Sequence, residues 1–331
     1  MRKIFLFSIS LLIGIGLFFW TLKIVGWQEI KSSFLVFTGW KGLAVLGLTL
    51  LMMLVGVWKW KEILKGVGVN VSFKGLINPY LAGFSIMFLV PIFLWGGEIF
   101  RSYILRERNS APWPKGMASV IIDRILEWTA NLVVIFLGGL FFVSTIGLPS
   151  AGLGIIFGGI FLVFLIGIVF FYFKCIKKES IVGFFLRGNQ GEPLETEKEI
   201  FKFFKPNKPQ MWKAVSLAFL RAGIMYFRAW LLILFLGKSI GALPVLSILG
   251  FSYLSLMIPI PTALGTHEAL QTFAFGSLNL SISTATAFTM IIRGAELIVA
   301  LIGIVFLFRS SVILLKRAFF KKVEKLSKQK E

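Results

Sequence analysis

Long runs of apolar residues dominate the pattern of hydrophobic and polar positions along this chain. A helix needs about 20 mainly apolar residues to cross roughly 30 Å of hydrocarbon, and several runs are long enough. The cores of these runs are Leu11–Thr21, Trp40–Val57, Asn131–Phe142, Leu153–Phe173 and Ile298–Phe308. Backbone groups in lipid must be hydrogen-bonded within the protein, and the alternating pattern of a membrane β-barrel is absent. The sequence therefore predicts an all-α integral membrane protein.

Composition excludes an ordinary soluble domain. Of the 331 residues, 57% are hydrophobic and 15% are charged, whereas soluble domains are about 25% charged. The single cysteine, Cys175, excludes an internal disulfide, and the single histidine, His267, argues against a zinc site. We therefore expect no metal and no cofactor. The first apolar segment, Ile4–Val25, lacks a small-residue cleavage site, so we interpret it as a span and not as a signal peptide.

The net charge of +20 lies mainly in the connections between apolar runs. This placement argues against nucleic-acid binding, which needs a basic soluble surface. It also predicts the topology of the chain, because connections rich in basic residues stay in the cytoplasm. One side holds 27 of the 35 basic residues: the N-terminus, Lys59–Gly75, Arg101–Lys115, Lys174–Lys213 and the tail from Arg309. We therefore expect a multi-pass protein of the cytoplasmic (inner) membrane with both termini in the cytoplasm.

Two interrupted apolar segments begin and end on the same side in this topology. Leu76–Phe100 begins and ends in the cytoplasm, and Pro244–Phe275 begins and ends outside. The residues that interrupt them are Pro91, Gly96 and Gly97 in the first, and Pro259, Pro261 and Gly265 in the second. We predict two re-entrant helical hairpins that enter from opposite sides, with helices starting at Gly97 and Thr266. The alternative is two ordinary spans that bend at proline.

The two interrupted segments and the spans that follow them share a spaced motif. Pro91 precedes Glu98 by seven residues, as Pro261 precedes Glu268. In the following spans, Arg124-Ile-Leu-Glu127 corresponds to Arg293-Gly-Ala-Glu296, with an alanine six residues before each arginine. Since the hairpins face opposite sides, this pattern predicts an inverted-topology repeat, as in many secondary transporters.

The expected organisation is a single membrane domain over residues 1–331. It has a first repeat of about 39–142, a cytoplasmic linker of about 174–211, a second repeat of about 212–308 and a basic cytoplasmic tail of 309–331. With the spans Ile4–Val25 and Leu153–Phe173, the fold has six spanning helices plus two hairpins.

Ionisable residues inside apolar segments are costly and indicate functional positions. The basic ones are Arg101, Arg124, Arg221, Arg228 and Arg293, and the acidic ones are Glu98, Asp123, Glu127, Glu268 and Glu296. One interpretation is that Arg124–Glu127 and Arg293–Glu296 are buried ion pairs that fix helix packing. The other is that the arginines line a central cavity and bind an anionic head group, held in place by the carboxylates. Arg221 and Arg228 favour the second, because their own helix has no carboxylate within a turn. Arg101 is also interpreted as an anchor to lipid phosphate.

Three groups of residues carry a resemblance to a known family. The first group is Pro91, Gly97, Glu98 and Arg101, the second is Asp123, Arg124 and Glu127, and the third is Pro261, Gly265 and Glu268. In these groups the chain resembles the lysylphosphatidylglycerol synthase transmembrane-region family. This is the flippase-like domain of multiple peptide resistance factors and their stand-alone relatives. The resemblance covers about Ile4–Phe308 and implies a lipid-translocating or lipid-handling module with two re-entrant hairpins. Family members are associated with aminoacylated phospholipids, hopanoid lipids and polyprenyl-linked glycans. The aminoacyl-transfer domain of the full synthases is not present in the 23 residues after Phe308, so we do not expect lysyl transfer.

These observations favour a flippase that moves an anionic phospholipid or polyprenyl-phosphate-linked head group, and not an enzyme. One alternative is an intramembrane transferase that uses a polyprenyl-phosphate donor, with Asp123, Glu127 or Glu98 as base. Another is an accessory subunit of a lipid-modifying enzyme, which the basic tail Lys316–Lys330 would contact. The expected partners are an anionic membrane lipid and, in the last case, that enzyme.

Overall fold

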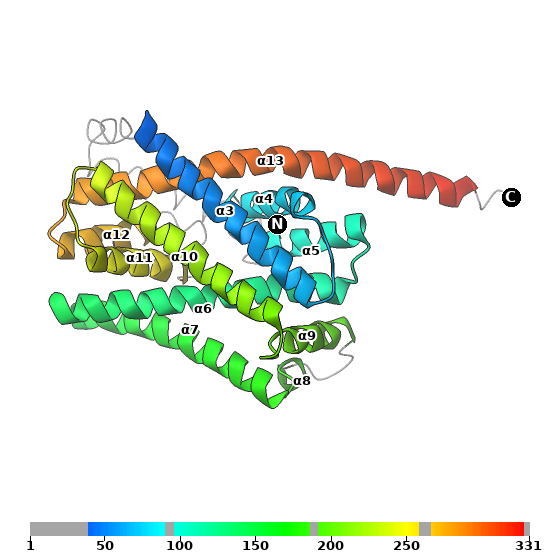
Figure 1. Cartoon of the computed structure of the whole chain (residues 1–331), viewed down its shortest axis with the longest axis horizontal. Coiled ribbons are helices and arrows are strands. Elements are labelled where there is room, and N and C mark those ends of the chain that lie inside the picture. The colour runs from blue at the N-terminus through cyan, green and yellow to red at the C-terminus, as the bar shows by residue number, and fades with distance from the viewer. Residues whose placement is uncertain (1–38, 90–95, 186–190, 258–265, 328–331) are drawn as a thin grey trace, which may run out of the picture.

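A computed structural model describes residues 39–89, 96–185, 191–257 and 266–327 (Figure 1). Every regular element in these ranges is a helix. The helices are α3 (Trp40–Gly66), α4 (Phe73–Leu89), α5 (Gly96–Asn109), α6 (Trp113–Thr145), α7 (Ala151–Lys177), α8 (Val182–Phe185), α9 (Gly191–Phe203), α10 (Pro209–Phe235), α11 (Ala242–Met257), α12 (Thr266–Ser277) and α13 (Ile282–Ser327). The prediction of an all-α membrane protein is confirmed.

Five helices in the described ranges are long and apolar enough to cross a membrane: α3, α6, α7, α10 and the Ile282–Leu307 part of α13. The sixth predicted span, Ile4–Val25, lies outside the described residues. The apolar run of α3 ends at Val57, and the helix continues nine residues beyond it, to Gly66. It continues since Trp60, Ile63 and Leu64 are fully buried and extend the apolar contact face beyond the apolar run.

Each interrupted segment forms two helices that contact each other. In the first, α4 and α5 approach closely at Gly83 and Gly97, where a Cβ atom on either residue would clash with the backbone of the other helix. In the second, the Gln271 amide of α12 donates hydrogen bonds to the Ile248 carbonyl at 3.2 Å and the Ser252 hydroxyl at 2.6 Å in α11. The described residues resume within these helices, α5 from Gly96 and α12 from Thr266, so the predicted starts at Gly97 and Thr266 are not tested. The predicted breaks at Pro91, Pro259, Pro261 and Gly265 lie outside the described residues.

The helices of the two predicted repeats pack across one another. Helix α3 runs along α10, α4 packs on α13, and α6 packs on α11 (Figure 1). Small residues bring these backbones together. The Ser85 hydroxyl donates to the Ala300 carbonyl at 2.6 Å, and the Ser247 hydroxyl donates to the Gly138 carbonyl at 2.7 Å. Each interrupted segment therefore packs against the charged span of the other predicted repeat.

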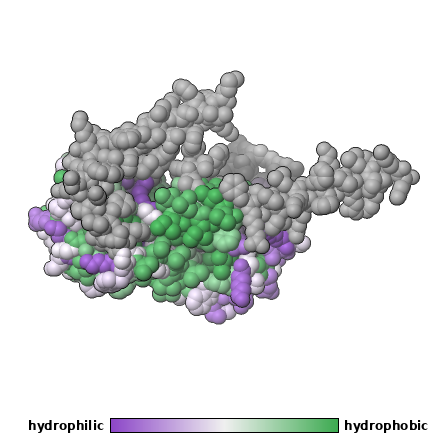
Figure 2. All heavy atoms as spheres, turned by 90° about the horizontal axis from the view of Figure 1, so that it is seen from above, coloured by the Kyte–Doolittle hydropathy of each residue, from purple (hydrophilic) through white to green (hydrophobic). Residues whose placement is uncertain are grey.

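The surface of the helical bundle is apolar over its middle. Figure 2 shows a hydrophobic patch at the centre of one face, with hydrophilic residues toward both ends of the long axis. Helix α7 is the most exposed span, with Ile168 as its buried residue and large apolar side chains such as Ile155 and Val163 on its surface. Exposed apolar surface of this extent is expected where lipid is the solvent.

The predicted linker of about 174–211 contains two helices that pack on the bundle. Helix α9 lies against α6, and its Phe203 side chain is fully buried against Gly66 of α3. The Lys208 ammonium group donates a hydrogen bond of 2.8 Å to the Gly66 carbonyl. Because Lys208 is partly desolvated, its pKa is lowered from its ordinary value. The segment that joins α7 to α10 is therefore attached to α3 and α6.

The adjacent glycines Gly138 and Gly139 of α6 test the close packing of α6 on α11. A Cβ on Gly138 would clash with the Leu246 carbonyl oxygen, whereas a Cβ on Gly139 would meet nothing within 4 Å. We expect Gly138→Ala to lower the free energy of unfolding by about 1–3 kcal/mol, as overpacking does. Thermal unfolding of the purified protein in detergent measures the effect. Gly139→Ala is the matched control, and equal melting temperatures for the two variants would contradict this packing.

Candidate functional site

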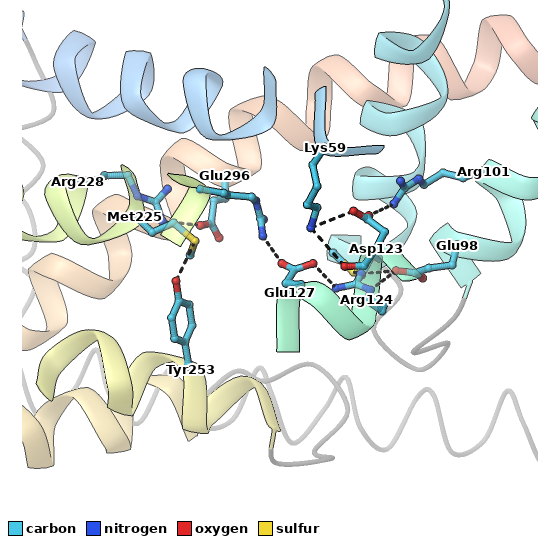
Figure 3. Close-up of polar contacts among 12 residues, drawn as sticks. Lys59, Glu98, Arg101, Asp123, Arg124, Glu127, Met225, Arg228, Tyr253 and Glu296 are labelled. Atoms are coloured by element: carbon cyan, nitrogen blue, oxygen red, sulfur yellow. Dashed lines mark hydrogen bonds and ion pairs between the residues drawn. The ribbon is translucent and has the colours of Figure 1, made fainter. Parts of the chain in front are cut away.

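Charged side chains from six helices gather inside the bundle, where they form four ion-paired groups. Figure 3 shows the groups around Asp123, Glu127 and Glu296. We call the four groups together the charge network. They are Lys59–Asp123–Arg101, Glu98–Arg124–Glu127–Arg221, Arg228–Glu296 and Glu268–Arg293. All ten predicted site residues with ionisable side chains are members, and Lys59 is an addition.

The first group is centred on Asp123 of α6. Its Oδ1 atom lies 2.9 Å from the Lys59 ammonium nitrogen of α3, and its Oδ2 atom lies 2.9 Å from Nη1 of Arg101 on α5. The Arg101 guanidinium also stacks on two aromatic rings, 4.0 Å from the Trp60 centroid and 4.7 Å from the Tyr80 centroid. The three charged side chains are 1–7% exposed. Arg101 is therefore buried in the bundle, where protein side chains surround its guanidinium group.

The second group joins the two predicted repeats. Arg124 of α6 donates from Nε to Glu98 of α5 at 2.5 Å, and its Nη1 lies 3.2 Å from Glu127 Oε2. The other oxygen of Glu127 accepts a hydrogen bond from Arg221 of α10. Arg124 also donates to the sulfur of Met87 on α4. One carboxylate therefore holds an arginine of the first predicted repeat and an arginine of the second.

The remaining two groups lie in the second predicted repeat. Arg228 of α10 is 3.0 Å from Glu296 of α13, and it donates a second bond of 3.0 Å to the Thr49 hydroxyl of α3. Arg293 of α13 lies 3.7 Å from Glu268 of α12. This contact corresponds to the Arg124–Glu98 pair of the first predicted repeat, since both join the first-turn glutamate of a short helix to the arginine of the next span.

The observed pairing differs from the interpretation made helix by helix. The predicted pair within one helix, Arg124–Glu127, is present. Glu296, predicted to pair with Arg293 of its own helix, takes its ion pair from Arg228. Arg221 and Arg228 have no carboxylate within a turn on their own helix, and each forms its ion pair with a carboxylate on another helix. The buried arginines are thus counterbalanced across helix boundaries, which the spacing within one helix cannot show.

The charge network is close to neutral. It contains six basic side chains and five carboxylates, so one positive charge is in excess. Several of its buried polar atoms have no hydrogen-bond partner in the described part of the chain: Nε and Nη2 of Arg101, Nε of Arg221, Nε of Arg228 and Oε2 of Glu98. Buried polar atoms normally have partners. The guanidinium groups therefore retain donor capacity beyond that used by the carboxylates.

Lys59 was not found by the sequence argument, which placed it in a cytoplasmic connection. One signal in the sequence points to it. Asp123 has no counterpart in the second motif, where Ile292 occupies the corresponding position, so this additional buried carboxylate requires an additional cation. Helix α3 supplies this cation two residues after the predicted end of its span.

Within the described ranges, the His, Cys, Asp and Glu side chains do not gather in groups of three or more that would hold a metal ion. The acidic residues of the charge network face basic side chains instead. Guanidinium groups form ion pairs and bidentate hydrogen bonds with anions in general.

The sequence pattern of the lysylphosphatidylglycerol synthase TM region matches residues 7–303. The chain belongs to this family. Among similar family proteins is a UPF0104 membrane protein of Methanocaldococcus jannaschii, which is 26% identical over 253 residues, covering 71% of this chain and 74% of the relative. A UPF0104 membrane protein of Pyrococcus horikoshii is 24% identical over 264 residues, covering 73% and 78%. No solved structure gives a significant match. The family resemblance expected from the motifs is confirmed, and the matched span contains all the residues of the charge network.

In this family member, substitution of Asp123 tests whether the group of Lys59, Asp123 and Arg101 stabilises the fold. Asp123→Asn leaves the buried Lys59 and Arg101 without a counter-charge, and we expect the free energy of unfolding to fall by about 3–5 kcal/mol. Adding Lys59→Met should restore part of the loss, because it removes one of the two uncompensated charges. Thermal unfolding in detergent measures both effects.

The control for this prediction is the exposed pair of Lys174 and Glu179, which lies outside the network. Lys174 donates a hydrogen bond of 2.6 Å to Glu179, and this bond lowers the pKa of the Glu179 carboxyl. Exposed ion pairs contribute little, so Glu179→Gln should melt close to wild type. Equal melting temperatures for Asp123→Asn and Glu179→Gln would contradict a structural role for Asp123.

Proposed function

We propose that this protein binds and translocates the anionic head group of a phospholipid or polyprenyl-phosphate-linked lipid along its buried arginines. The observation that carries the proposal is the position of Glu127, whose carboxylate holds Arg124 and Arg221 from the two predicted repeats. The family description, which names the lipid lysylphosphatidylglycerol, supports a lipid-related role.

Differences in exposure separate the arginines that can meet a ligand from those that cannot. The side chains of Arg124, Glu127 and Arg221 are 13–18% exposed, and those of Arg293 and Glu268 are 22% and 13% exposed. The Asp123 group is almost completely enclosed, and so is the Arg228 side chain. In this proposal, Arg124, Arg221 and Arg293 contact the head group, while Lys59, Arg101 and Arg228 fix the helices around them.

A phosphate can replace a carboxylate as the partner of an arginine. Both present two oxygens that share negative charge and that accept two parallel N–H···O bonds from a planar guanidinium group. Removing Glu127 without replacement would leave Arg124 short of one partner and Arg221 unpaired, which is costly in an apolar interior. A head group that takes over these bonds compensates for that cost. We therefore propose that the lipid exchanges with Glu127, so that the arginines are never left uncompensated.

Inverted repeats would give this exchange two symmetric states. The contact of Gly303 with Leu81 corresponds to the contact of Gly250 with Val134, and each residue lies 169 positions from its counterpart, as Arg293 does from Arg124. Such reciprocal packing supports the inverted repeat with two re-entrant hairpins. In transporters built this way, one repeat moves against the other around a site near the midplane. The basic connections support an orientation with both termini in the cytoplasm.

The test is head-group translocation in proteoliposomes, with fluorescent anionic phospholipids and a leaflet-specific quencher. Arg124→Ala, Arg221→Ala and Arg293→Ala should each reduce the translocation rate by about ten-fold or more, the effect of losing one charge-assisted hydrogen bond. Lys198→Ala, which changes an exposed basic residue of α9, is the control. Translocation that persists in all three arginine variants would contradict this path.

Arg221→Lys separates a ligand contact from a structural ion pair. Lysine keeps the positive charge opposite Glu127 but loses the planar fork that matches phosphate. We expect Arg221→Lys to melt close to wild type and to translocate more slowly. If Arg221→Lys translocates lipid at the wild-type rate, Arg221 serves helix packing and does not contact the head group. If the wild-type protein itself does not translocate lipid, a transferase or accessory role is favoured.

A further inference from the structure

A cavity of about 430 Å³ is lined by residues of α6, α7, α8 and α9. Figure 1 shows α8 and α9 next to each other at one end of the bundle. Its volume falls within the ~300–1,000 Å³ range typical of small-molecule sites. The walls include Trp113, Met117 and Ile121 of α6, Phe171 of α7, and Ile200 and Phe201 of α9. None of these residues belongs to the charge network, so the cavity is separate from the site proposed above.

The polar residues that line the cavity do not make it a site for a polar ligand. The Glu197 carboxylate is already occupied: it accepts hydrogen bonds from the Ser180 hydroxyl at 2.5 Å and from the backbone amides of Ile181 and Val182 at 2.6 and 3.0 Å. The Thr196 hydroxyl donates to the Glu192 carbonyl of its own helix at 2.9 Å. Water is held in cavities by several polar partners, whereas this lining favours an apolar occupant.

The position of the cavity favours a lipid chain as that occupant. Two of its walls, α6 and α7, are long enough to cross a membrane, and α7 presents most of its surface to lipid. Phe170 and Phe173, the neighbours of Phe171 on α7, are exposed. The last turn of α7 is basic, as expected where a span leaves the hydrocarbon. The cavity is partly open, so a lipid chain can enter it while its head group stays at the membrane surface.

We propose that this cavity binds one acyl chain of a bilayer lipid, between the spans α6 and α7 and the helices α8 and α9. The bound chain fills the apolar space under α9 and links the α8–α9 segment to the membrane. Because this segment connects α7 to α10 and is held to α3 by Phe203 and Lys208, the occupant contacts the connection between the two predicted repeats.

The experiment uses the full chain in detergent with a phosphatidylcholine that carries a photoreactive diazirine at the end of one acyl chain. The lipid is added at low molar ratio, so that detergent competes for the outer surface, and labelled peptides are mapped by mass spectrometry. We expect the label on α6 and α9 residues that line the cavity. Label confined to the outer surface of α7, or absent, would overturn the proposal.

A cavity-filling variant provides a quantitative test. Ile121→Phe places a larger side chain in the cavity, and Ile155→Phe makes the same change at an exposed position of α7. Displacing about two methylene groups of the bound chain should lower labelling of α6 and α9 by about ten-fold in Ile121→Phe. Ile155→Phe should leave this labelling unchanged, and equal labelling of these helices in the two variants would overturn the proposal. If Ile121→Phe does not fold, the wild-type label map decides.

Discussion

A guanidinium group in an apolar helix bundle must keep a counter-charge, because neither lipid nor apolar side chains can solvate it. The arrangement of this structure follows from that requirement. Each buried arginine of the network faces a carboxylate, and most of these pairs join different helices. The helices are therefore held in register by charge as well as by the close approach of small residues. At Glu127 this requirement links the two predicted repeats, since one carboxylate serves arginines from both.

The two kinds of burial in the network suggest a division of roles. Asp123 is enclosed by two cations, and the aromatic rings of Trp60 and Tyr80 cover Arg101, so this group suits a rigid structural unit. Glu127 and its arginines are more accessible, and an anion that replaces Glu127 as their partner keeps a counter-charge opposite each arginine. The cavity under α9 provides a different environment, in which apolar contact is the available interaction.

Much of the fold was predictable from sequence, because it depends on local properties. Apolar runs located the spans, and the two interrupted segments each contain two separate helices, α4 with α5 and α11 with α12. The membership of the charge network was also predictable, since an ionisable residue in an apolar run is conspicuous. Which of these residues pair with each other was not predictable, because the Arg228–Glu296 and Arg221–Glu127 pairs depend on which helices pack together. Lys59 was missed for a related reason: burial of Trp60 and Ile63 against other helices, and not the local apolar run, extends α3 beyond Val57.

The proposed translocation requires the ion pair between Glu127 and Arg221 to yield to an anionic lipid. The coupling free energy of the two residues tests this, from a double-mutant cycle of Glu127→Gln and Arg221→Met by thermal unfolding in detergent. It is measured with and without an anionic phospholipid. Without lipid, we expect a coupling of about 1–3 kcal/mol, as for buried partners in contact, and a clear decrease when the lipid is present. A coupling that is unchanged by the lipid would contradict the proposed exchange of Glu127 for the lipid.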